Sequence, residues 1–156
     1  MMNLILWRHA DAEDSSPDIS RQLTEKGHRQ AKKMAAWLST RLPDNTRILV
    51  SPATRAQQTA QALTTDYTTV NLLAPGAAPD QILSLAGWPM AKENILIVGH
   101  QPSLGMAVAK AMTGRADYWS VKKGSIWWLG NRIRGDERQT LIRAVLLPEM
   151  LEDQDL

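Results

Sequence analysis

The 156-residue sequence contains no cysteine and no phenylalanine. The lack of cysteine excludes thiol nucleophiles, disulfides and cysteine-bound metals, and it fits a reducing compartment, so a cytoplasmic location is expected. The formal net charge of +2 is too small to favour nucleic acid or a membrane surface as a partner. No internal repeat or low-complexity tract is present. These absences leave an ordinary globular protein.

Long hydrophobic runs are missing too. The first apolar run, "LILW", stops at Arg8 and has no basic region before it, so we expect neither a signal peptide nor a membrane span. The length suits one hydrophobic core. We therefore predict a single domain over residues 1–150, followed by an acidic, frayed tail over residues 151–156.

Four short apolar runs predict strands near residues 5, 49, 70 and 97. Because these runs are continuous and do not alternate, both faces of the sheet should be covered and the strands should be parallel. Near the C-terminus, "GSIWWLG" and "TLIRAVLLP" predict an antiparallel pair joined by a polar turn over residues 131–139. Trp127 and Trp128 should then point to opposite faces, either both buried or with one indole free to dock a partner.

Helical patterns separate the predicted strands. One begins with Thr24 as the N-cap and turns a set of apolar residues inward, namely Ala31, Met34, Ala35, Leu38 and Leu42. A second is expected to begin with Ser51 as the N-cap and Pro52 at the first helical position. A third follows Pro102 and ends near Gly114. The predicted fold class is α/β, with three layers: a mostly parallel central sheet flanked by helices, and an antiparallel edge near the C-terminus.

Chemically distinctive residues follow three of the predicted strands. Arg8 and His9 follow the first strand, the segment from Ser51 to Arg55 follows the second, and His100 follows the fourth. The carboxyl ends of parallel strands share one edge of a sheet, where ligands commonly bind. We therefore expect His9, Arg55 and His100 to converge.

Such a cluster suits phosphoryl binding and transfer. The guanidinium groups of Arg8 and Arg55 can bind phosphate oxygens bidentately, and helix N-termini add backbone donors. Nearby arginines should keep His9 neutral, so that its imidazole can attack phosphorus. His100, if protonated, would stabilise charge on the phosphoryl oxygens.

Four motifs in order, "LWRHA", "RQLTEKGHRQA", "ILVSPATRAQQTA" and "LIVGHQP", resemble the histidine phosphatase superfamily, whose members are phosphoglycerate-mutase-like. The resemblance is strongest to its small phosphohistidine phosphatase branch, of the SixA type. It implies that His9 is the nucleophile, that Arg8 and Arg55 clamp the phosphate, and that His100 is the second catalytic histidine. It further implies that Arg21 lies near the phosphate, that Gln101 contributes to substrate binding, and that no metal or other cofactor is needed.

The sequence departs from the family pattern at two places. Ala10 stands where a glycine is usual, and no glutamate occupies the segment "NLLAPGAAPDQ", where larger members carry a proton donor. An alkoxide leaving group needs such a donor far more than a protonated phosphoramidate does. A phosphohistidine is therefore the favoured substrate. The short chain has no insertion to enclose a small molecule, which favours a protein partner such as a histidine-containing phosphotransfer domain of a signalling relay.

Two other functions remain open from the sequence. A phosphomonoesterase for a small phosphorylated metabolite would need an acid from Asp11, Glu13 or the substrate itself. A non-catalytic phosphate-binding module would need no nucleophile, so the presence of His9 argues against it. Arg21 also has an alternative role, since an arginine before a helix often forms a local ion pair, here with Asp18.

Overall fold

The computed structural model describes residues 1–153, which form a six-stranded sheet with the strand order β3-β2-β4-β1-β5-β6. The parallel strands are β1 (Met2–Arg8), β2 (Thr46–Val50), β3 (Thr68–Thr69) and β4 (Asn94–Gly99). Strands β5 (Ile126–Arg134) and β6 (Glu137–Leu146) add an antiparallel edge beside β1. The predicted mixed sheet with its antiparallel edge is confirmed.

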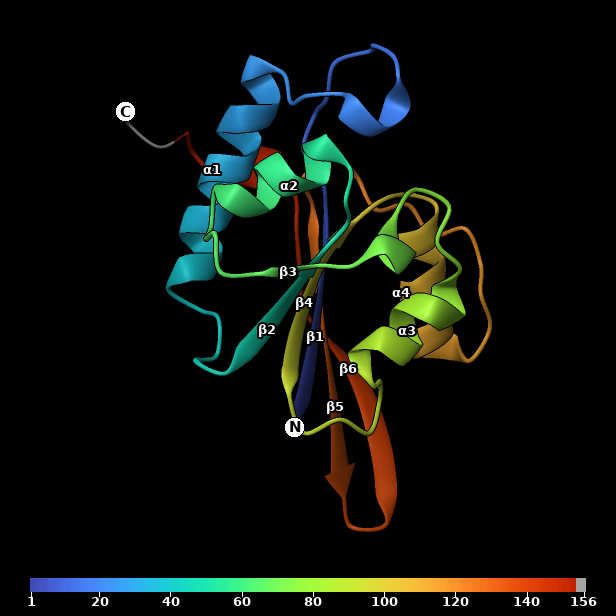
Figure 1. Ribbon diagram of the computed structural model, residues 1–156. Coiled ribbons are helices and arrows are strands. Elements are labelled where there is room, and N and C mark those ends of the chain that lie inside the picture. Colours follow the sequence, from blue (N-terminus) through green and yellow to red (C-terminus); the bar gives the residue numbers. More distant parts are fainter. Residues whose placement is uncertain (154–156) are drawn as a thin grey trace.

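Four helices cover the two faces of this sheet (Figure 1). Helices α1 (Glu25–Ser39) and α2 (Thr54–Gln61) lie together on one face. Helices α3 (Pro79–Ala86) and α4 (Ser103–Thr113) lie together on the other. Short 3₁₀ turns, η1 (Asp18–Ser20), η2 (Asn71–Leu73) and η3 (Pro148–Met150), occur in the connections. The molecule therefore has the three layers that the sequence predicts.

Strand β1 is continuously apolar because both of its faces are covered by helices. Leu4 and Leu6 contribute to the core beneath α3 and α4, whereas Ile5 and Trp7 contribute to the core beneath α1 and α2. Alternate residues of a strand point to opposite faces, so a strand covered on both sides has no polar face. The same rule separates Trp127 from Trp128, which lie on opposite faces as predicted, with Trp128 buried.

Helix α1 begins where the sequence predicts. The Thr24 side chain accepts a hydrogen bond from the Gly27 amide at 3.0 Å, which is the N-cap interaction. Gly27 is required there because a Cβ atom at this position would lie 1.9 Å from the Asp11 carbonyl oxygen. The first turn of α1 therefore lies directly against the segment that follows His9.

Three local predictions were wrong in detail. Helix α2 begins at Thr54 with Ala53 as the N-cap, because Ser51 is used in a turn before the helix, where its hydroxyl accepts from the Ala53 amide. The strand predicted near residue 70 is only the two-residue β3, followed by η2. The polar segment 131–139 continues β5 and β6 as a hairpin that turns at Gly135.

The C-terminal segment is described as far as residue 153. Leu151 packs against the core beneath α1, and Lys33 donates to the Leu151 carbonyl and pairs with Asp153. The remainder of the predicted tail, residues 154–156, lies outside the described residues. Within residues 1–153, none of the helices has the length and hydropathy that a membrane crossing requires.

Candidate active site

Strand register brings the two predicted catalytic histidines together. Arg8 of β1 is paired with Gly99 of β4, so His9 and His100 are the next residue along each of two neighbouring parallel strands. The His9 amide continues the ladder by donating to the Gly99 carbonyl. The two imidazole centroids are 5.2 Å apart, and both residues are buried. The expected convergence at the carboxyl edge of the sheet is therefore present.

Two arginines border this histidine pair. Arg55, in the first turn of α2, is only 4% exposed and places its Nε 3.3 Å from His9 Nε2. Arg8 donates from Nη1 to the Val121 carbonyl at 2.9 Å, and its Nε is buried without a partner among the described residues. Burial, and then the charge of Arg55, lower the pKa of Arg8. Two cations are therefore held close together where an anion would relieve their repulsion.

Hydrogen bonds define the state of His9. Its Nδ1 lies 2.7 Å from the Ala10 carbonyl oxygen, which can only accept, so Nδ1 carries the proton. Nε2 then has a free electron pair, and it accepts from Arg55. Burial is the main reason that the pKa of His9 falls to about 4; the bond to Ala10 opposes this shift and the Arg55 charge adds to it. His9 is therefore neutral at pH 7, as predicted, although burial contributes more than the arginines.

The protonation state of His100 differs from the one considered from the sequence, in which the ring is charged. Burial, followed by the charges of His9 and Arg55, lowers the pKa of His100 to about 3, so the free site holds it neutral. Its Nε2 lies 2.7 Å from the Ser51 hydroxyl, whereas its Nδ1 is buried without a partner among the described residues. A protonated His100 is therefore not the resting state.

Asp18 is a member of the site that the motifs did not identify. Its carboxylate pairs with Arg55 at 3.2 Å and with Arg21 at 3.2 Å, and its carbonyl oxygen accepts from Arg55 at 2.8 Å. Hydrogen bonding to Arg21, reinforced by Arg55, lowers the pKa of Asp18. The local ion pair between Arg21 and Asp18, which the sequence suggested, is present, and the same carboxylate also pairs with Arg55. The second pair could not be predicted from the sequence, because Asp18 and Arg55 are brought together only by the fold.

Other candidate residues have different contacts. The Gln101 side chain donates to the Trp119 carbonyl and accepts from the Gly105 amide, so both of its polar groups are used in holding the start of α4. The Asp11 carboxylate accepts from Thr24, and this bond is the main reason that its pKa is lowered. Asp11 is thus ionised and engaged at α1, which makes it a poor proton donor.

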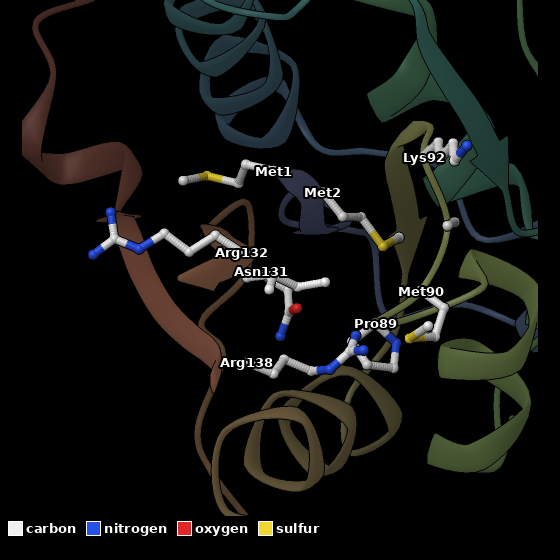
Figure 2. A pocket seen from close by; sticks show the side chains of 10 residues that line it. Met1, Met2, Pro89, Met90, Lys92, Asn131, Arg132 and Arg138 are labelled. Atoms are coloured by element: carbon white, nitrogen blue, oxygen red, sulfur yellow. The ribbon is translucent and has the colours of Figure 1, made fainter. Parts of the chain in front are cut away.

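The arrangement can bind a phosphoryl group and attack it. A neutral imidazole with a free electron pair lies beside two guanidinium groups, and two buried nitrogens, Arg8 Nε and His100 Nδ1, have no protein partner within residues 1–153. Over the same residues, no three histidine or acidic side chains are grouped as a metal site requires. A separate cavity of about 390 Å³ lies at the other end of the sheet, between Met1, Lys92 and Arg138 (Figure 2).

Comparison with known proteins identifies the class. The model of the histidine phosphatase superfamily (branch 1) matches residues 4–73. Escherichia coli phosphohistidine phosphatase SixA is 30% identical over 124 residues, which cover 72% of this chain and 76% of the E. coli protein. The chain therefore belongs to the histidine phosphatase superfamily, and this membership supports a phosphatase activity.

Within that class, the chain is similar to proteins of the SixA type in structure as well as sequence. The structure of the protein histidine phosphatase SixA complexed with tungstate superimposes with a TM-score of 0.75 at 23% identity, covering 97% of this chain and 100% of that chain. A putative SixA from Nakamurella multipartitia gives a TM-score of 0.75 at 25% identity, over 94% of this chain and 96% of that one. The phosphoglycerate-mutase-like fold expected from the motifs is confirmed.

Proposed function

We propose that this protein is a metal-independent phosphatase that hydrolyses phosphohistidine on a partner protein through a covalent intermediate on His9. The observation that carries the proposal is the state of His9: Nδ1–H is bonded to Ala10, and the unprotonated Nε2 accepts a hydrogen bond from Arg55 Nε at 3.3 Å. A neutral imidazole held beside fixed cations is suited to attack an anionic phosphoryl group. Residues 1–150 would act as one domain, in the cytoplasm.

The proposed reaction has two displacements. In the first, His9 Nε2 forms a bond to phosphorus while the bond from phosphorus to the substrate imidazole breaks. The departing nitrogen keeps the electron pair of that bond, and the imidazole leaves neutral because its other ring nitrogen already carries a proton. In the second, water attacks phosphorus, the bond to His9 Nε2 breaks with its electron pair returning to that nitrogen, and both water protons remain with the released phosphate. Arg8, Arg55 and His100 would hold the phosphoryl oxygens in both steps. Arg21 would contribute from the rim.

The choice of a phosphorus–nitrogen substrate rests on the acids near the site. Asp11 is engaged with Thr24, and Asp18 is paired with two arginines, and the pKa of each is lowered. Neither is suited to protonate an alkoxide leaving group, and Glu13 contacts Arg21 only through its carbonyl oxygen. Phosphohistidine needs no such donor. The name phosphohistidine phosphatase, carried by the E. coli relative, supports the same substrate class.

The test compares His9→Ala with His28→Ala, a matched change at an exposed histidine of α1. We expect His9→Ala to reduce turnover of a phosphohistidine protein to background and His28→Ala to leave it unchanged. Trapping the wild-type protein should place phosphate on His9 in a form stable to alkali and lost in acid. Substantial turnover by His9→Ala, or an alkali-labile adduct, would remove His9 as the nucleophile.

A further inference from the structure

Ser51 makes a contact in the site that its place in the sequence did not suggest. It is fully buried at the end of β2, and its hydroxyl oxygen lies 2.7 Å from His100 Nε2. The same oxygen accepts a hydrogen bond from the Ala53 amide at 3.1 Å. The hydroxyl is therefore fixed from two sides.

These two contacts favour one position for the proton of the neutral His100 ring. The Ala53 amide can only donate, so it occupies one of the two electron pairs of the Ser51 oxygen. Among the described residues, His100 Nε2 is the acceptor within reach of this fully buried hydroxyl, so a proton on Nε2 would leave the Ser51 proton without a partner. Directing the hydroxyl proton to Nε2 satisfies it, and the neutral ring then carries its own proton on Nδ1. His100 Nδ1 is the buried nitrogen that has no partner among the described residues. The result is an unused donor beside His9.

We infer that Ser51 is a positioning residue that holds His100 as the neutral Nδ1–H tautomer, so that Nδ1–H donates to the phosphoryl group during transfer. This inference rests on the proposed function, because it takes a phosphate as the missing partner. The other tautomer would present an electron pair to an anion and repel it. Ser51 thus makes His100 a hydrogen-bond donor without requiring the ring to be charged.

The direct test is the proton position on His100, measured by long-range ¹H–¹⁵N NMR of the imidazole rings in the wild-type protein at pH 7 without substrate. We expect a protonated Nδ1 and an unprotonated Nε2, with the Nδ1–H resonance shifting when inorganic phosphate is added. A proton found on Nε2 would overturn the inference. Because this measurement needs no turnover, it stands apart from the assay of His9→Ala.

The functional test uses Ser51→Ala, with Ser125→Ala as the matched control. Ser125 is also a buried serine, but its hydroxyl has no hydrogen-bond partner among the described residues. We expect Ser51→Ala to lower kcat by roughly 10- to 100-fold with KM changed much less, since misdirecting a transition-state donor costs somewhat less than deleting one. It should also populate the Nε2–H tautomer of His100.

Rescue distinguishes positioning from simple packing. Ser51→Thr retains the hydroxyl and should restore both the Nδ1–H tautomer and most of kcat, whereas Ser125→Ala should resemble the wild type throughout. A Ser51→Ala protein with normal kcat and an unchanged tautomer would contradict the inference. If Ser51→Ala or Ser51→Thr does not fold, the tautomer of the wild-type protein decides the matter alone.

Discussion

The two ends of the sheet are both rich in cations, yet they differ in how those cations are held. At the carboxyl end of β1 and β4, Arg55 is almost fully buried against His9 and Asp18. At the amino end, Lys92, Arg132 and Arg138 are exposed around an open cavity (Figure 2). The cation of the first end is thus enclosed by other side chains, whereas those of the second end face solvent.

This difference teaches that burial, more than the number of cations, sets the proposed active site apart. Exposed cations are screened by water and are free to change rotamer, so they contribute little directed field. Buried cations cannot be solvated, and they affect the groups beside them: the pKa values of His9 and His100 fall to about 4 and about 3, mainly through the same burial.

The largest expected effect concerns the leaving group, because the buried end provides cations and neutral imidazoles but no suitable acid. Phosphohistidine and aryl phosphates should be hydrolysed faster than alkyl phosphates, by roughly 10²–10⁴ in kcat/KM. The measurement is kcat/KM for one phosphohistidine protein and one sugar phosphate under the same conditions. If the sugar phosphate is the better substrate, the protein is a small-metabolite phosphatase.

Introducing a carboxylate near the site tests directly whether a missing proton donor causes this preference. Pro75→Glu introduces a carboxylate in the segment where larger relatives carry their proton donor, and Pro75 is exposed. The neighbouring Gly76 is unsuitable, since its φ of +91° disfavours any other residue. We expect Pro75→Glu to raise activity on the alkyl phosphate more than on phosphohistidine. An equal change on both substrates would indicate that the carboxylate does not reach the leaving group.

The second prediction compares one arginine from each end. Arg55→Ala should lower kcat/KM by roughly 10²–10³, because it removes a buried donor to the transferring phosphoryl group. Arg138→Ala removes the same charge from the opposite end and should leave kcat/KM within twofold of the wild type. Both variants are measured on the same aryl phosphate. Equal losses would mean that long-range attraction of the substrate, and not local binding, explains the role of the arginines.

The third prediction follows from the lowered histidine pKa values. Between about pH 4 and the ordinary histidine pKa of 6.5, the unfolded chain binds more protons than the folded protein, since His9 stays neutral in the fold down to about pH 4. The free energy of unfolding should therefore fall as the pH falls through this range, by up to about 1.4 kcal/mol per pH unit for each buried histidine. Denaturant unfolding at several pH values measures the slope. His9→Gln should reduce it; an unchanged slope would contradict the assignment.

The smallest expected effect concerns Asp18, whose carboxylate already occupies groups of Arg55 and Arg21 that a phosphate would use. Removing this exposed charge should favour an incoming anion by about 1 kcal/mol, or roughly fivefold in Kd. Asp18→Asn should therefore bind inorganic phosphate more tightly than the wild type in calorimetry. Asp14→Asn, a change on the same exposed segment, is the control. Weaker binding by Asp18→Asn would show that Asp18 chiefly orients the arginines.

Much of the fold and the centre of the site were predictable because they depend on periodicity and on strand ends. The apolar runs locate β1, β2 and β4, and the parallel arrangement then places His9 beside His100. The details that could not be predicted depend on side-chain rotamers and loop paths. Ser51 has the sequence pattern of a helix cap, but its hydroxyl bonds to His100. Gln101 follows His100 in the motif, yet its side chain supports α4. Helix α3 was not predicted: it has only eight residues, and unlike the segment before α2, no serine precedes its proline, since Ala78 stands at the N-cap.

The register between β1 and β4 also has a consequence for how the activity could be lost while every motif residue is kept. Neighbouring strands are about 4.8 Å apart, close to the 5.2 Å between the His9 and His100 rings, so the spacing of this histidine pair follows from the spacing of the strands. Sliding β4 by one residue against β1 would direct His100 to the other face of the sheet. An insertion or deletion within either strand should therefore silence the enzyme while preserving every residue of its motifs. The position of the two histidines therefore depends on the number of residues that precede them in each strand as much as on the histidines themselves.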